Sequence, residues 1–247
     1  QRLEKQTQNL FNPSIGKLIK LWGFHSNDYV QEAIPNQEII QKLVSSNPSM
    51  ESIIIENKVL KSNNKNVQID LGGYAKGYAL DQAKKILASN DVKNALINIG
   101  GNILAFGKHG ERDWLVGIQN PRKPNAFATI SLKSGWAIGT SGDYQRYIMV
   151  NNQRYSHLIN PKTGYPESKT QSATILMPPS ENSGTLSDVF SKPLFISSKI
   201  KKADMAKLLN IKYFLIIMDD HSILISEDLN KKINWDDDID KKIITIL

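Results

Sequence analysis

Residues 67–77 read VQIDLGGYAKG, and this stretch predicts the local fold around a candidate ligand site. Residues 67–71 are typical of a short strand, the pair Gly72-Gly73 permits a tight turn, and a helix is expected to follow and to end at a cap near Asn90. Such a helix directs its first N–H groups outward, and Lys76 adds a positive charge. The spacing matches neither the Walker A motif nor the dinucleotide fingerprint, so a phosphate site and a plain glycine turn are equally good interpretations. The apolar face of the helix is expected to hold Ala79, Ala83, Ile86 and Leu87.

Outward from this stretch, the sequence alternates between runs of strands and separate helices. Residues 1–50 predict helical pieces broken by prolines, residues 52–60 predict a pair of short strands, and Asn151-Asn152 predicts a hairpin turn. Strands are expected at Ala95–Ile99, Ile103–Gly107, Trp114–Gln119, Ala128–Leu132, Ala137–Thr140, Tyr147–Val150, Gln153–His157, Thr170–Met177, Tyr213–Met218 and Ile223–Ile225. Helices are expected near Ser187 and over Ala203–Asn210. This order favours an α+β fold over a doubly wound sheet.

Length and composition limit the classes of function. A chain of 247 residues buries one substantial core, as one domain or as two closely packed halves. The formal charge of +7 comes from scattered lysines interleaved with acids, without the aromatic spacing of a nucleic-acid platform, so no nucleic-acid partner is expected. The absence of cysteine excludes disulfides, thiol catalysis and thiolate metal sites. No apolar run approaches the roughly 18 residues that a membrane span requires.

One histidine stands out by its position. His157 ends a predicted strand, and the turn-forming residues Asn160-Pro161 and Thr163-Gly164 follow directly. Catalytic groups often occupy such positions, and histidine titrates near neutral pH, although a histidine that only stabilises the fold is the simpler interpretation. The other histidines, His25, His109 and His221, are expected at the surface.

Two further polar segments carry possible ligands. Asp188 and Ser191 are oxygen donors one helical turn apart and would suit Mg²⁺, whereas a capping role for Ser187 or Asp188 at a helix start is the simpler interpretation. The glycine-bearing segment 139–144 either binds a ligand through hydroxyl and N–H groups or is a polar loop, and the loop is the default expectation.

Taken together, these segments resemble the ApbE family of FAD:protein FMN transferases. The resemblance extends from about Leu10 to Ile225, most of the chain. The matching segments, in the order the family has them, are Leu10–Gly16 with Leu21–Phe24, Asp70–Gly77, Gly100–Asn102, Thr140–Tyr144, His157–Pro166 and Asp188–Phe195. The resemblance implies a single α+β domain over residues 1–247 with a T-fold-like core of mixed and antiparallel strands.

The resemblance also implies a reaction and its residues. FAD and a protein threonine would give phosphoester-linked FMN and AMP, with Mg²⁺ required and with an acceptor protein as partner. His157 would remove the proton of the threonine, and Gly73, through its carbonyl group, would bind the metal with Asp188 and Ser191. The implied FAD contacts are Leu10, Phe11, Asn12, Asp70, Lys76 and Ile159. Family members are commonly exported, which implies an extracytoplasmic location in the periplasm or at the outer face of the cell membrane, with any lipid anchor in a segment before Gln1.

The chain departs from the family pattern at several positions. Lys192 stands where the family usually has threonine, which replaces a metal-ligand oxygen by a cation, and Pro193 follows in the same predicted helix. Asn12 and Asn160 stand where aspartate is common. The family's leading strand has no counterpart before Gln1, and its loss is expected to open part of the adenine pocket.

These departures keep two alternatives to flavin transfer open. The first is a protein that binds FAD without transferring FMN, which Lys192 favours. The second is a pyrophosphatase that splits FAD into FMN and AMP with water in place of threonine. His157 and Asp188 favour an enzyme, and the transferase is the leading prediction.

Overall fold

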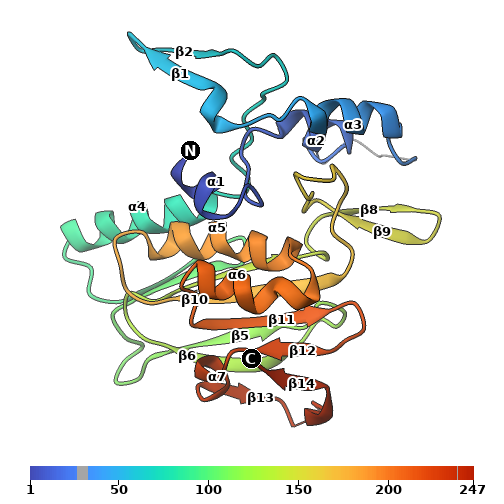
Figure 1. The fold of residues 1–247 in the computed structure, drawn as a ribbon. Helices are drawn as coiled ribbons and strands as arrows, with labels where there is room; N and C mark the ends of the chain where they lie inside the picture. Colours follow the sequence, from blue (N-terminus) through green and yellow to red (C-terminus); the bar gives the residue numbers. More distant parts are fainter. Residues whose placement is uncertain (27–32, 238) are drawn as a thin grey trace.

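The computed structural model describes residues 1–26, 33–237 and 239–247, and its centre is a seven-stranded sheet (Figure 1). Neighbouring strands pair antiparallel, except for the edge pair β12 and β14, which is parallel. In spatial order the strands are β14 (Ile244–Ile246), β12 (Ile223–Ile225), β11 (Tyr213–Met218), β10 (Thr170–Met177), β7 (Ala137–Gly142), β4 (Asn102–Phe106) and β3 (Ala95–Ile99). One large sheet with separate helices confirms the predicted α+β class.

Strands β10 and β11 are buried on both faces. Successive side chains of a strand point to opposite sides, so a two-sided core needs a continuous apolar run. In β10, Ala173 and Ile175 belong to the core on one face and Leu176 to the core on the other. In β11, Phe214 belongs to the first of these cores and Leu215 to the second. The apolar runs that predicted these strands therefore also specify that both faces are covered.

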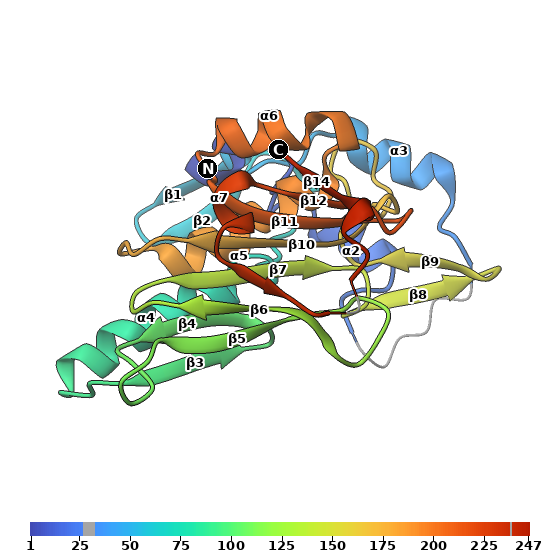
Figure 2. The same ribbon diagram turned by 90° about the horizontal axis from the view of Figure 1, so that it is seen from below.

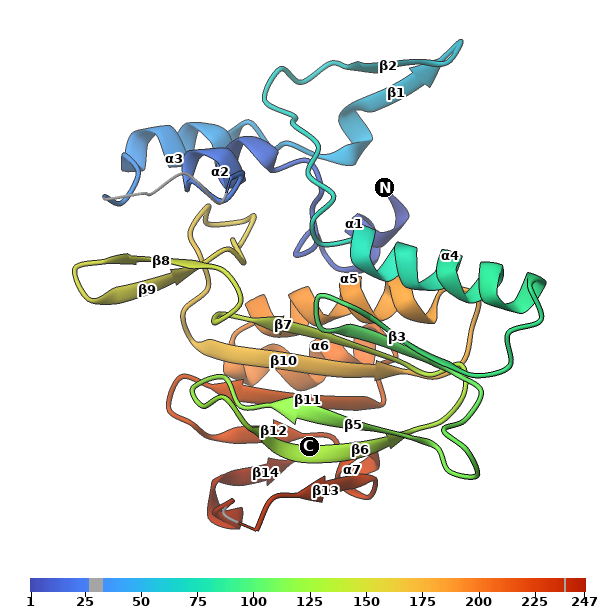
Figure 3. The same ribbon diagram turned by 180° about the vertical axis from the view of Figure 1, so that it is seen from behind.

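Helices cover one face of the sheet and a second sheet covers the other. The helices are α4 (Ala75–Ser89), α5 (Ser183–Ile196) and α6 (Lys202–Leu208). The second sheet consists of β5 (Trp114–Gln119), β6 (Ala126–Leu132) and β13 (Ile233–Trp235). The view from behind shows β5 and β6 against the large sheet, on the side away from the helices (Figure 3). Short elements α7 (Glu227–Asn230), η2 (Lys199–Lys201) and η3 (Lys241–Ile243) complete the C-terminal part.

The N-terminal part of the chain forms a cap above α4 and α5 in Figure 1. A small core of Leu18, Trp22, Ile40 and Ile159 joins this cap to the segment after β9, and Trp22 Nε1 donates to the carbonyl of Gly164 at 2.8 Å. The elements of the cap are α1 (Arg2–Gln6), α2 (Gly16–Leu21), α3 (Gln37–Ser45), η1 (Met50–Ser52), β1 (Ile53–Glu56) and β2 (Val59–Ser62).

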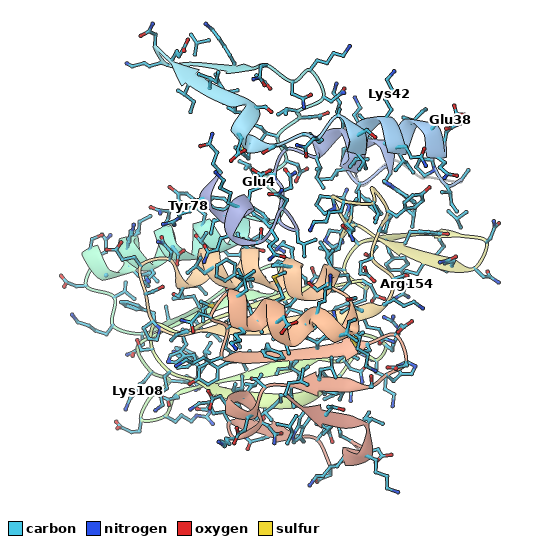
Figure 4. The ribbon with its side chains drawn as sticks, viewed as in Figure 1. Glu4, Glu38, Lys42, Tyr78, Lys108 and Arg154 are labelled. Carbon is cyan, nitrogen blue, oxygen red and sulfur yellow. The ribbon has the colours of Figure 1, made fainter. Side chains whose placement is uncertain are left out.

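One smaller feature lies within the cap, and another extends from the body. Glu4, labelled in Figure 4, is buried between α1 and η1, where its Oε2 accepts the N–H of Met50 at 3.0 Å. The hairpin of β8 (Tyr147–Val150) and β9 (Gln153–Ser156) extends beyond the end of β7 (Figure 2). The turn residues Asn151 and Asn152 have φ angles of 50° and 60°, as the predicted hairpin turn requires.

Helices α4 and α5 cap each other where they cross. A side chain on Gly184 would place its Cβ 2.6 Å from the carbonyl oxygen of Gly77, so only glycines allow this approach. The carboxylate of Asp81 in α4 accepts the N–H groups of Gly184 and Thr185, each at 2.8 Å, at the start of α5. In return, Asp188 of α5 accepts the N–H of Gly77 at 2.9 Å, near the start of α4. This exchange fixes both helix starts relative to each other.

Several sequence predictions are wrong in detail. Residues 67–71 form no strand, because they pair only with the segment 13–16, through a single bridge between Ile15 and Gln68. The buried side of α4 holds Gly77, Leu80 and Asp81, whereas Ile86 is 61% exposed. The cap of α4 at Asn90 is confirmed.

The interpretations of two later segments are also corrected. Ser187 and Asp188 lie inside α5 rather than at its start, since the helix begins at Ser183 and Asp81 supplies the capping carboxylate. Residues 139–142 belong to strand β7 and not to a loop. Strands β13 and β14 and the short helix α7 lack a counterpart in the prediction. Within the described ranges, the helices are too short or too polar for any of them to span a membrane.

Candidate active site

A cavity of about 440 Å³ lies between the N-terminal cap, the starts of α4 and β8, and helix α5. It gathers most of the residues that the family resemblance singles out. Those that line it are Leu10, Phe11, Asn12, Asp70, Gly73, Lys76, His157 and Ile159. Residues that are far apart in the sequence, such as Leu10 and Ile159 at a separation of 149 positions, therefore share one site.

One wall of the cavity is apolar. Leu10, Phe11 and Ile159 are all largely buried and contribute to it, together with Phe24 and Ile196. Asn12 holds this part of the lining in place through two hydrogen bonds. Its Nδ2 donates to the carbonyl of Pro48 at 2.7 Å, and its Oδ1 accepts the N–H of Ser14 at 2.8 Å. A wall of this kind suits the flat aromatic part of a ligand.

Three other residues that line the cavity are positively charged. Lys76 lies in the first turn of α4, and Arg146 and Lys192 also face the cavity. Asp70 shapes the neighbouring turn, since its Oδ1 accepts the N–H of Gly72 at 2.8 Å. A helix start with three cations around it favours an anionic group such as a phosphate.

The side chain of His157 is held as a neutral base. Its backbone N–H donates to the carbonyl of Arg146 at 3.0 Å, and Nδ1 lies 3.0 Å from the same oxygen. Because a carbonyl oxygen only accepts, Nδ1 carries the proton and Nε2 keeps its lone pair. Burial is the main reason why the pKa of His157 is lowered to about 4; the hydrogen bond to the Arg146 carbonyl opposes this shift, and the charges of Lys192, Lys76 and Arg146 add to it. The imidazole is therefore neutral at pH 7 and able to accept a proton.

This depressed pKa predicts an acid-sensitive fold. The unfolded chain protonates His157 near pH 6.5, whereas the folded chain does so only near pH 4, so stability is lost as pH falls through this window. Between pH 7 and pH 5 the parent should lose about 2 kcal/mol more unfolding free energy than the His157→Gln variant, whose amide does not titrate. Urea unfolding at the two pH values measures this difference, and equal losses would contradict the assigned protonation state.

Asp188 and Ser191 do not line the cavity, whereas Lys192, which contacts Asp188, does. Ser191 Oγ donates to the carbonyl of Asp188 at 2.8 Å and contacts Ser141 Oγ at 2.7 Å. Lys192 Nζ donates to the carbonyl oxygen of Asp188 at 2.6 Å and to its carboxylate Oδ1. The side chain of Lys192 also touches Gly73, because a Cβ on Gly73 would lie 2.8 Å from Lys192 Cε. The structure therefore brings Gly73 and Asp188 together through Lys192, while Ser191 turns toward β7.

The ionisation of this pair follows from its surroundings. Burial alone would raise the pKa of Asp188, but Lys192 and the N–H of Gly77 more than offset it and hold the pKa below its usual value. Burial lowers the pKa of Lys192, and the Asp188 carboxylate opposes this shift. At neutral pH Asp188 is therefore ionised.

The residues present do not fit the Mg²⁺ ion that the family resemblance implies. Both carboxylate oxygens of Asp188 already accept N–H donors, and the ammonium group of Lys192 adds a positive charge beside them. Magnesium requires oxygen ligands in near-octahedral order. In the described parts of the chain, no group of three or more histidine, cysteine, aspartate or glutamate side chains is placed to hold a metal.

Sequence reasoning did not assign Arg146 and Gln145 to the site, although both line the cavity. A signal for Arg146 was present. The hairpin turn at Asn151-Asn152 pairs Tyr147 with Ser156, so the next pair outward is Arg146 with His157. The expected surface positions of His25, His109 and His221 are confirmed, since all three are exposed.

These features define an α+β protein with a cavity suited to an aromatic ligand that carries phosphate groups. The model of the ApbE family matches residues 1–215, and the chain belongs to this family. Two curated relatives are FAD:protein FMN transferases. The one from Rhodobacter capsulatus is 33% identical over 92% of this chain and 43% of its own length, and the one from Haemophilus influenzae is 28% identical over 90% and 65%. The chain thus spans about half to two thirds of the length of these relatives.

Solved structures agree with this assignment. The ApbE protein from Thermotoga maritima superposes with a TM-score of 0.81 at 32% identity, covering 94% of this chain and 74% of that protein. The flavin transferase ApbE from Vibrio cholerae gives a TM-score of 0.77 at 26% identity, covering 94% and 73%.

Proposed function

We propose that this chain transfers the FMN half of FAD to the hydroxyl group of a threonine in another protein and releases AMP. One observation carries the proposal: the neutral imidazole of His157 opens into the same cavity as an apolar wall and a cluster of cations. A flavin ring suits the apolar residues of the lining, and a pyrophosphate suits its cations. The names of the curated relatives support the same reaction.

The proposed step balances with residues of this chain alone. The threonine Oγ attacks the phosphorus atom of the FMN half, and the bond from that phosphorus to the bridging oxygen breaks, so that AMP leaves with this oxygen. Nε2 of His157 takes the proton of the threonine. Lys76, Lys192 and Arg146 offset the charge that develops on the phosphate oxygens. Since the donor atoms do not fit Mg²⁺, no part of this step depends on a metal.

A covalent-flavin assay tests the proposal. The protein is incubated with FAD and an acceptor domain that carries the target threonine, and a denaturing gel is then examined for flavin fluorescence. We expect a fluorescent acceptor band that is lost when the threonine is replaced by alanine. FAD bound without any fluorescent band would favour the binding protein without transfer, and free FMN and AMP without acceptor would favour the pyrophosphatase.

We also propose that the reaction takes place outside the cytoplasm, as the family resemblance implies. Fractionation of cells followed by detection of this chain tests the location, and recovery in the cytoplasmic fraction would contradict it.

A further inference from the structure

Lys192 is largely buried, which is unusual for a lysine side chain. Its side chain is 13% exposed, its partner Asp188 is 1% exposed, and the two lie one helical turn apart in α5. The lysine stem packs against Gly73, in the turn before α4. The ammonium group therefore lies between the glycine turn, the Asp188 carboxylate and the cavity.

We infer that the Lys192 ammonium group is a built-in cation for the pyrophosphate of FAD and makes a divalent metal at this position unnecessary. The inference rests on the proposed function, because it assumes that FAD occupies this cavity. It assigns to Lys192 the charge-neutralising role that the family resemblance had assigned to Mg²⁺.

The hydrogen bonds of Lys192 leave it one donor for a ligand. An ammonium group has three N–H donors. Two of them are directed to the carbonyl oxygen and the carboxylate Oδ1 of Asp188, and the side chain lines the cavity. The two anchored donors fix the third in place, so a phosphate oxygen meets a preorganised charge-assisted donor.

The same contacts leave no place for a metal ion on the Asp188 carboxylate. Asp188 Oδ2 is held by the N–H of Gly77, and Oδ1 is held by Lys192. A metal would have to displace one of these donors and would then lie beside a buried ammonium group of the same sign. Lys76 and Arg146 line the same cavity and supply further positive charge, so the site does not depend on Lys192 alone.

The test compares FAD affinity of the folded protein in excess EDTA and in excess Mg²⁺, measured by quenching of flavin fluorescence. For the parent we expect affinities within about twofold of each other. Lys192→Thr removes the ammonium group and restores a ligand oxygen, so its affinity should fall at least about tenfold in EDTA and recover in Mg²⁺. Lys192→Met has neither an ammonium group nor a ligand oxygen, so its affinity for FAD should fall both in EDTA and in Mg²⁺.

A matched control separates a local effect from a general one. Lys84 lies on α4, outside the cavity, and donates to the carbonyl of Ser180 at 2.6 Å, so Lys84→Met should leave FAD affinity unchanged in either buffer. Thermal unfolding followed by circular dichroism checks that each variant is folded. If Lys192→Thr does not fold, the comparison of the parent in EDTA and Mg²⁺ decides the question by itself.

Two outcomes would count against these ideas in different ways. A parent protein that loses tenfold or more of its FAD affinity in EDTA would overturn the role of Lys192 and leave the proposed function intact. A parent that binds no FAD in either buffer would overturn the proposed function itself.

Discussion

Replacing His157 with alanine should lower the rate of flavin transfer by about 10²- to 10⁴-fold, while FAD affinity changes by less than about threefold. The imidazole is the base in the proposed step, and its Nδ1 is already held by the carbonyl of Arg146. Its loss removes the proton acceptor and leaves the apolar wall and the three cations in place. Single-turnover formation of fluorescent acceptor measures the rate, and equilibrium titration with FAD measures the affinity.

The matched control for this substitution is His109→Ala. His109 is exposed and stacks on Trp114, on the second sheet and away from the cavity. Its removal should leave both quantities unchanged. If His157→Ala and His109→Ala transferred flavin at the same rate, His157 would not be the base, and its contacts with Arg146 would have only a structural role.

Much of the fold follows from local patterns in the sequence. The apolar runs at β10 and β11 are strong signals because both faces of these strands are buried. The existence of helix α4 and its cap at Asn90 are predicted correctly, whereas its buried face is not. The strand expected at 67–71 fails for a non-local reason: it meets the segment 13–16 in a single bridge, which is too short to form a ladder.

The candidate site also combines features that the local sequence predicts with features that depend on distant contacts. The position of His157 after a strand and before a turn is visible in the sequence, and so is the glycine turn that leads to Lys76. The hydrogen-bond partners of Asp188 are not visible in the sequence. Its carboxylate accepts from Gly77, 111 residues earlier, and from Lys192, one helical turn later. From spacing alone, a helix cap was the simpler interpretation of Asp188, and a metal ligand was the alternative. The long-range contact with α4 decides in favour of the hydrogen-bonded arrangement.

Replacing Asp81 with alanine should lower the free energy of unfolding by about 3–5 kcal/mol. Asp81 is fully buried, and its carboxylate accepts the N–H groups of Gly184 and Thr185 and, at 2.7 Å, the hydroxyl of Thr185. Alanine leaves all three donors without an acceptor inside the protein and removes a negative charge from the start of α5. Urea unfolding monitored by circular dichroism measures the loss.

The size of this effect depends on burial rather than on charge, and Asp91→Asn is the control for this. Asp91 is exposed and follows α4, its ion pair with Lys93 at 3.7 Å is also exposed, and asparagine tolerates its φ angle of 56°, so the loss of its charge should change stability by less than about 0.5 kcal/mol. Helix α5 also carries Asp188 and Lys192, so any displacement of its start by Asp81→Ala should weaken FAD binding as well. Equal stability of Asp81→Ala and Asp91→Asn would show that the crossing of α4 and α5 is held by its glycines and not by the exchanged carboxylates.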